Sequence, residues 1–92
     1  MDITTSSRKD KRFTAYFENG LTVHFGQRNP TIGTYIDHGD ADIKHNYILR
    51  HMNNGEDWAN PYTAGALSRW ILWGPSPDIN VNIRLYKHRF NL

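Results

Sequence analysis

Apolar and polar side chains alternate in two short segments near the start of the chain, and this pattern predicts a β-hairpin. The first segment covers residues 12–17 and the second covers residues 21–25, and in each the apolar side chains occupy every second position. Glu18, Asn19 and Gly20 stand between them. Asn-Gly between alternating segments is the strongest short-range signal for a hairpin turn, because both residues tolerate positive φ angles. A lone hairpin is unstable in water, so we expect other elements to cover its apolar face.

The segments that flank the predicted hairpin carry weaker patterns. Residues 1–10 are polar, which predicts a flexible polar and basic arm ahead of a single compact domain over residues 11–92. Residues 26–33 are rich in Gly, Asn and Pro and predict a loop. After this loop, residues 34–36 (Thr-Tyr-Ile) could add a short third strand.

The spacing of apolar residues further along the chain predicts helices. A first helix is expected over residues 41 to about 53, because Asp40 is a suitable N-cap and apolar residues recur at helical spacing behind it. A second helix is expected over residues 64 to about 73, with Thr63 as its N-cap and a Gly-Pro pair to end it.

The segment over residues 78–90 is ambiguous from its apolar spacing alone. Its first apolar residues alternate as in a strand, but a wider set also falls at helical spacing. That set is Ile79, Ile83, Tyr86 and Phe90. Ser76 is a candidate N-cap, Pro77 suits the first helical position and Asp78 suits the first turn, so the local signals favour a third helix.

These elements together predict an α+β fold, in which an N-terminal β-hairpin with a possible third strand packs on three short α-helices. The 92 residues leave room for one core. Apolar residues make up 38% of the chain and aromatic residues 13%, so we expect the core to rely on its aromatic side chains. The expected core residues are Phe13, Phe17, Val23, Phe25, Ile43, Tyr47, Leu67, Trp70, Ile71, Ile83 and Phe90.

The predicted second helix carries two of the three tryptophans, Trp70 and Trp73. It is apolar around most of its circumference, which is typical of a central core helix. We expect Trp70 to be buried and Trp73 to be partly exposed, so that one tryptophan builds the core and the other meets a partner. Trp73, Trp58 and Arg69 are the candidate partner-binding residues, because exposed tryptophans are typical interface anchors.

The sequence nominates no catalytic chemistry. The absence of cysteine excludes disulfides and thiolate sites, and no glycine-rich phosphate loop or nucleophile motif is present. Among the five histidines, His45 and His51 are six residues apart and cannot share a helix face, so no metal site is expected. No segment approaches the roughly 20 apolar residues of a membrane span. We therefore expect no enzyme, no cofactor, no small-molecule substrate and no membrane span.

The distribution of charged residues along the chain indicates an alternative function. The net charge is only +2, but basic residues gather near both ends of the chain while acidic residues gather in the middle. A small nucleic-acid-binding protein could place these cations on phosphates, with an affinity that falls steeply with salt. This alternative requires the two basic ends to meet in space. The residues concerned are Arg8, Lys9, Lys11, Arg12, Lys87 and Arg89.

Several motifs together resemble a known family. Residues 12–26 are R-F-T-A-Y-F-E-N-G-L-T-V-H-F-G, residues 47–51 are Y-I-L-R-H, residues 63–73 are T-A-G-A-L-S-R-W-I-L-W, and residues 86–90 are Y-K-H-R-F. With Trp58 they resemble a family of small uncharacterised proteins from large nucleocytoplasmic DNA viruses of algae and protists. The resemblance covers about residues 11–92. The loops depart from the family pattern, notably Q-R-N-P-T-I-G at 27–33 and G-P-S-P-D at 74–78.

This resemblance carries no known activity, but it implies a setting. In a large DNA virus, a compact aromatic-rich module without catalytic motifs is expected to be a structural component. The resulting expectation is a non-enzymatic binding protein, a minor capsid component that contacts other capsid proteins. Its expected location is the virion, and the host cytoplasm or nucleus during infection.

Overall fold

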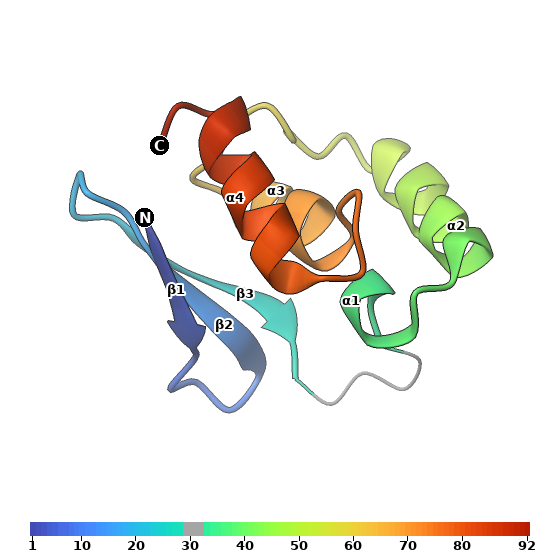
Figure 1. Ribbon diagram of the computed structural model, residues 1–92, viewed down its shortest axis with the longest axis horizontal. Coiled ribbons are helices and arrows are strands. Elements are labelled where there is room, and N and C mark those ends of the chain that lie inside the picture. Colours follow the sequence, from blue (N-terminus) through green and yellow to red (C-terminus); the bar gives the residue numbers. More distant parts are fainter. Residues whose placement is uncertain (29–32) are drawn as a thin grey trace.

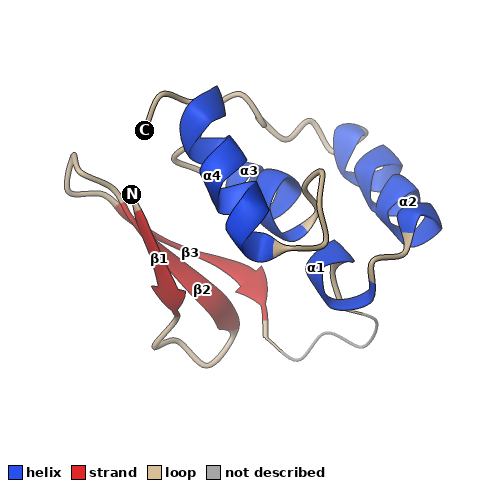
Figure 2. Cartoon of the chain, in the orientation of Figure 1, coloured by secondary structure: helices blue, strands red, loops and turns tan. Residues whose placement is uncertain are grey.

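The computed structural model describes residues 1–28 and 33–92 and shows an antiparallel three-stranded sheet with helices gathered on one side (Figure 1). The strands, which lie in sequential order, are β1 (Asp2–Thr5), β2 (Lys11–Tyr16) and β3 (Thr22–Gln27). The helices are α1 (Tyr35–His38), α2 (Ala41–Met52), α3 (Ala64–Leu67) and α4 (Ile79–Arg89), and a π-helical turn, η1 (Ser68–Leu72), follows α3 directly. Figure 2 separates the sheet from the helices by colour. The predicted α+β class is confirmed, with four helices in the described chain where three were expected.

The predicted hairpin is formed by β2 and β3, which pair with Phe13 opposite Phe25. Its turn is closed by the Gly20 N–H, which donates to the Phe17 carbonyl at 3.0 Å. Gly20 has a φ of 91°, whereas Asn19 is not among the described residues with positive φ. The left-handed conformation that the turn needs is therefore supplied by glycine alone, as in hairpin loops that end in a glycine bulge.

The first residues of the chain do not form the predicted flexible arm. Residues 2–5 are strand β1, which pairs with β2 so that Ile3 lies opposite Ala15. Met1 is only 8% exposed and belongs to the core. Strand β1 satisfies the backbone groups along one edge of β2, an energetic gain that apolar spacing alone does not reveal. The compact unit therefore includes residues 1–10.

The possible third strand at residues 34–36 does not form, because Tyr35 and Ile36 begin helix α1. The Asp37 carboxylate caps this short helix by accepting hydrogen bonds from the Thr34 N–H (2.8 Å) and hydroxyl (2.9 Å). The predicted loop over residues 26–33 starts later than expected, since residues 26 and 27 end β3. Its residues 29–32 lie outside the described part of the chain.

The other helix starts follow local capping chemistry. The predicted cap of α2 is confirmed, since the Asp40 carboxylate accepts hydrogen bonds from the N–H groups of Asp42 and Ile43. The helix over the ambiguous last segment is confirmed as α4, but its cap is Asp78 and not Ser76. Asp78 accepts the N–H of Asn80 at 2.9 Å, because a carboxylate directly before the first turn meets its free N–H groups best.

The predicted second helix begins at Thr63 as expected, but its second half has a wider turn. The Trp73 N–H donates to the Ser68 carbonyl, five residues back, at 3.0 Å. The fully buried side chain of Asn82 supports the end of this turn. Its amide donates to the carbonyls of Ile71 (2.9 Å) and Ser76 (2.7 Å), and its oxygen accepts the Ser76 N–H (3.0 Å).

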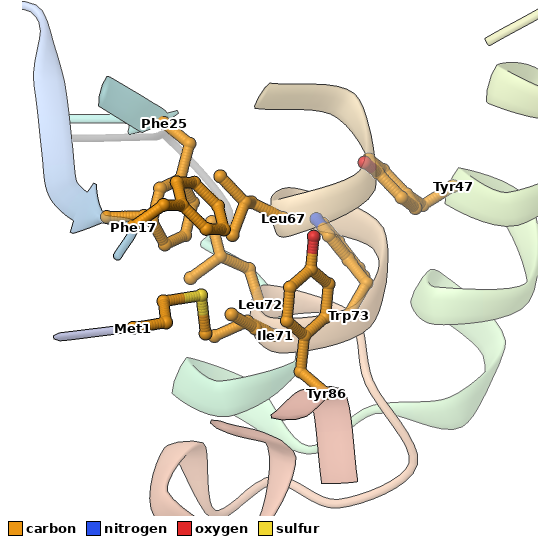
Figure 3. Close-up of a cluster of buried hydrophobic side chains, with 10 residues drawn as sticks. Met1, Phe17, Phe25, Tyr47, Leu67, Ile71, Leu72, Trp73 and Tyr86 are labelled. Carbon is orange, nitrogen blue, oxygen red and sulfur yellow. The ribbon is translucent and has the colours of Figure 1, made fainter. Parts of the chain in front are cut away.

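The core lies between the sheet, η1 and α4 (Figure 3). Five of the predicted core residues are buried: Phe17, Phe25, Tyr47, Leu67 and Ile71. The other six are partly buried against them: Phe13, Val23, Ile43, Trp70, Ile83 and Phe90. The sequence did not nominate five further members of the buried cluster: Met1, Ala15, Leu72, Trp73 and Tyr86.

Helix α2 stands apart from the sheet in Figure 1, and it is joined to the core by an aromatic stack, by a lysine hydrogen bond and by the partly buried Ile43 and Ile48. The Tyr47 ring lies parallel to Trp73 with centroids 4.2 Å apart, and His51 stacks on the Tyr47 ring at 4.1 Å. The Lys44 ammonium donates to the Gly74 carbonyl at 2.7 Å. These contacts connect α2 to the end of η1.

Candidate functional site

Two tryptophans and two arginines from distant parts of the chain form one surface cluster. The guanidinium carbon of Arg69 lies 4.2 Å from the centroid of the Trp70 ring and 5.3 Å from that of Trp58. The guanidinium carbon of Arg89 lies 3.8 Å from the Trp70 centroid. We call Trp58, Arg69, Trp70 and Arg89 the Trp–Arg surface. Both guanidinium groups are within range for cation–π attraction to the same indole.

Three elements position the members of the Trp–Arg surface. Arg69 and Trp70 are consecutive residues of η1, and Arg89 is the last residue of α4. Trp58 comes from the connection between α2 and α3, and its carbonyl accepts the indole N–H of Trp70 at 3.0 Å. Arg69 is fixed by a hydrogen bond to the Trp73 carbonyl at 2.8 Å. The side chains of Arg69 and Trp70 are therefore held by hydrogen bonds within the chain.

The positive charge of this surface has no partner within the chain. The ion pairs among the described residues are Arg8–Asp10, Arg12–Asp37 and His51–Glu56. The remaining residues, 29–32, are Asn-Pro-Thr-Ile and carry no acid. Burial lowers the pKa of the Arg69 guanidinium, and the nearby charge of Arg89 lowers it further. The Arg69 Nε is buried and has no hydrogen-bond acceptor among the residues that the structure describes.

The two predicted partner-binding residues Trp58 and Arg69 are brought together, but the third, Trp73, is not. Trp73 is 7% exposed and stacks on Tyr47 inside the cluster of buried side chains. The expected exposures of the two helix tryptophans are therefore reversed, because Trp70 is only partly buried. The wider π-helical turn changes which faces its residues occupy, so face assignments made from α-helical spacing fail here.

The basic residues of the nucleic-acid alternative do not form one patch. In Figure 1 the turn between β1 and β2, which carries Arg8 and Lys9, lies at the opposite end of the view from the C-terminal end of α4, which carries Lys87 and Arg89. Arg12 is neutralised by a two-pronged ion pair with Asp37, at 2.6 and 2.7 Å. The described structure therefore does not bring together the two basic ends that the nucleic-acid alternative requires.

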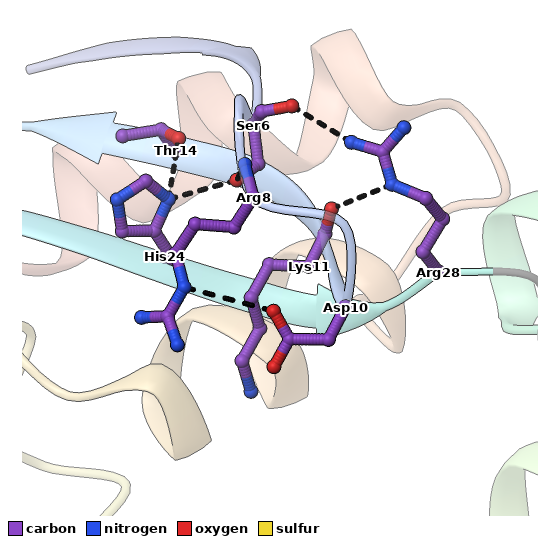
Figure 4. Close-up of polar contacts among 7 residues, drawn as sticks. All are labelled: Ser6, Arg8, Asp10, Lys11, Thr14, His24 and Arg28. Carbon is purple, nitrogen blue, oxygen red and sulfur yellow. Dashed lines mark hydrogen bonds and ion pairs between the residues drawn. The ribbon is translucent and has the colours of Figure 1, made fainter.

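The β1–β2 turn is instead tied to its own sheet (Figure 4). Arg28 donates to the carbonyls of Ser6 (2.7 Å) and Lys11 (3.0 Å), and Arg8 pairs with Asp10 at 3.6 Å. These bonds hold the backbone of the turn. Lys11, also named in the alternative, lies partly buried at the start of β2.

A hollow of about 980 Å³ lies between α2, α3 and the adjacent ends of β2 and β3. Tyr47 and Trp73 contribute to its wall, and the His51 ring nitrogen lies 2.5 Å from the Glu56 carboxylate at its margin. The hollow is lined by acidic, basic and apolar side chains, so it favours neither an anionic nor a cationic ligand. Among the residues that the structure describes, no three His, Asp or Glu side chains converge in a way that could hold a metal ion.

Sequence reasoning missed two members of the Trp–Arg surface as partner-binding residues. Trp70 was assigned to the core, and Arg89 was assigned to a separate basic cluster. Nothing in the local sequence shows that Arg89 meets η1, because the contact depends on how α4 packs.

The helices in the described part of the chain are all too short or too polar to cross a bilayer.

Comparison with known proteins gives one match. Residues 1–51 match the model of a protein family described as a family of unknown function (DUF5754). This part of the chain spans the whole sheet, α1 and most of α2, whereas the Trp–Arg surface lies beyond it. The comparisons with curated proteins and with solved structures gave no match.

Proposed function

Since this chain belongs to that family of unknown function, we propose its role from its own surface: it is a non-enzymatic binding protein that docks on a partner protein. The docking face is the Trp–Arg surface. In this proposal the compact fold serves as a rigid support for side chains that contact the partner.

The observation that carries this proposal is the presence of two guanidinium groups on one indole with no acidic partner in the chain. Tryptophan and arginine are the residues most enriched at the energetic centres of protein interfaces. Arg69 and Trp70 already make side-chain hydrogen bonds within the chain, so ordering these two side chains on binding costs little conformational entropy. Both properties favour a docking role for this surface.

We further propose that the partner is another structural protein and that the chain is a minor capsid component of a large DNA virus. This finer assignment rests on the resemblance of residues 11–92 to small proteins of such viruses. The protein would then be located in the virion, and in the host cytoplasm or nucleus during infection. Its task would be to connect capsid subunits.

Quantitative mass spectrometry of purified virions tests this assignment. Emptied shells and DNA-containing cores are measured separately, and a non-structural viral protein in the same samples reports contamination. We expect enrichment in the shell at a fixed ratio to the major capsid protein. Enrichment with the core would favour the nucleic-acid alternative, and absence from both fractions would refute a virion role.

A further inference from the structure

We propose that the Trp–Arg surface recognises an acidic segment of its partner protein, with carboxylate groups beside Arg69 and Arg89 and an apolar side chain on the neighbouring rings. This inference rests on the proposed docking function and specifies the chemistry of the partner. It concerns the surface itself and does not depend on whether the partner is a capsid protein.

The first argument is the uncompensated charge. The guanidinium carbons of Arg69 and Arg89 both lie within 4.2 Å of the centroid of Trp70, so the two like charges are close neighbours. The charge of Arg69 also reaches Lys44 and contributes to the lowered pKa of that ammonium group, for which burial is the larger cause. Partly buried charges normally have counter-charges, and a bound carboxylate would supply one here.

The two acids next to Trp58 in the sequence make other contacts and form no ion pair with Arg69 or Arg89 in the described structure. The Glu56 carboxylate is paired with His51, and the Asp57 carboxylate accepts the backbone N–H of Ala59 at 3.1 Å. Arg69 retains a buried Nε that has no acceptor among the described residues. A partner carboxylate beside the guanidinium would bring a counter-charge that the described residues do not supply.

The second argument is the apolar area beside the charges. Trp58 and Trp70 are both only partly buried. Leu85 lies one helical turn before Arg89 on the same side of α4, and it is 41% exposed. An acidic segment that also carries a leucine or similar residue would cover this apolar area while its carboxylates meet the arginines.

The geometry favours a protein carboxylate over a nucleic-acid backbone. A nucleic acid presents successive phosphates, and its binding sites combine stacking platforms with a continuous basic groove. Here the basic turn between β1 and β2 lies at the opposite end of Figure 1 from the C-terminal end of α4, and Arg12 is neutralised by Asp37. Two arginines confined to one aromatic cluster suit a short acidic peptide better.

Fluorescence anisotropy with short labelled peptides tests the inference. The probes are a peptide of alternating Glu and Leu, the same peptide with Lys in place of Glu, and a single-stranded DNA oligonucleotide. The test variant is Arg89→Gln, and the matched control is Arg84→Gln, which removes the same charge from an exposed position on α4 outside the Trp–Arg surface. Circular dichroism melting of both variants verifies that they remain folded.

We expect the Glu-Leu peptide to bind, with an affinity that Arg89→Gln lowers by roughly fivefold to tenfold and that Arg84→Gln changes by less than about twofold. A second variant, Arg89→Lys, should recover only part of the affinity, because lysine keeps the charge but not the planar group. Equal binding of the Glu and Lys peptides would overturn the inference. Equal losses in the Arg89 and Arg84 variants, or DNA binding that depends on Arg89 without peptide binding, would also overturn it.

The two proposals fail separately. Absence of the protein from virions would refute the capsid assignment while leaving peptide binding at the Trp–Arg surface intact. A virion protein whose surface ignores acidic peptides would retain a structural role and lose the acidic partner.

Discussion

Replacing Asn82 by leucine should destabilise the protein strongly, although the two side chains have similar volumes. The side chain is fully buried and takes part in three hydrogen bonds, which join α4 to the end of η1 and to the connection between them. Leucine has nearly the same shape as asparagine and would fill the same space. The substitution therefore removes the hydrogen bonds without leaving a large cavity.

The expected loss of stability can be worked out from the groups that remain. The Ile71 carbonyl is buried and would lose its Asn82 donor, which costs about 1–3 kcal/mol for an unpaired polar group. The N–H and carbonyl of Ser76 are only partly buried, so water would replace part of their hydrogen bonding. We expect a total loss of about 3 kcal/mol, a large share of the roughly 5–15 kcal/mol that stabilises a domain.

Urea unfolding followed by tryptophan fluorescence measures this loss of free energy, and thermal unfolding followed by the same signal measures the melting temperature. The control is Asn80→Leu, which makes the same chemical change at an exposed position on the same helix. Asn82→Leu should lower the melting temperature by roughly 12–24 °C, and Asn80→Leu should leave it nearly unchanged. If Asn82→Leu lost less than about 1 kcal/mol, or no more than the control, the assignment of this amide as the link between α4 and η1 would be wrong.

Four further substitutions test other parts of the fold. Trp73→Ala should lower the free energy of unfolding by about 3–5 kcal/mol, measured by thermal or urea unfolding, because the ring is buried. An unchanged melting temperature would contradict this core role and favour the original prediction that Trp73 contacts a partner. Gly74→Ala should destabilise the protein strongly, because the added methyl group would overlap the Trp70 carbonyl oxygen. The control Gly20→Ala should lower the free energy of unfolding by only about 1 kcal/mol, because the space around Gly20 is open and only its φ of 91° is unfavourable for alanine. The hydrogen-bonded guanidinium of Arg12 holds the pKa of the Asp37 carboxyl well below its ordinary value of 3.8. The Arg12–Asp37 ion pair therefore contributes to the free energy of unfolding above that pH, and this contribution declines as the pH falls below it. Asp37→Asn should therefore make stability less sensitive to acid in melts between about pH 5 and pH 2, and equal acid sensitivity would contradict the role of the ion pair.

The sequence predicted the elements whose signals are local. The Asn-Gly turn, the Asp40 cap and the helix over residues 78–90 depend on a few adjacent residues, and all three are confirmed. Strand β1 escaped prediction because Ile3 is the only apolar residue among its four, and its stability comes from pairing with β2. Such pairing depends on residues about ten positions away.

The candidate site was predictable only in part for the same reason. Trp58 and Arg69 were identified by residue type, and they do lie together. The exchange of roles between Trp70 and Trp73 follows from the π-helical turn, which apolar spacing does not signal. Arg89 joins the surface through the packing of α4 on η1, a contact between residues nineteen or more positions apart in the sequence.

The attachment of α2 through a few contacts outside the sheet has a consequence for how the protein opens. Tyr47 stacks on Trp73, Lys44 bonds Gly74, and Ile43 and Ile48 pack against the core. We expect α2 to separate from the core while the sheet keeps its register. Amide hydrogens in α2 should therefore exchange with solvent through a local opening of lower free energy than those in β2. Each local opening of α2 would expose the indole of Trp73 to solvent. Trp73, the most deeply buried of the three tryptophans, would therefore be exposed more often by separation of this one helix than by global unfolding.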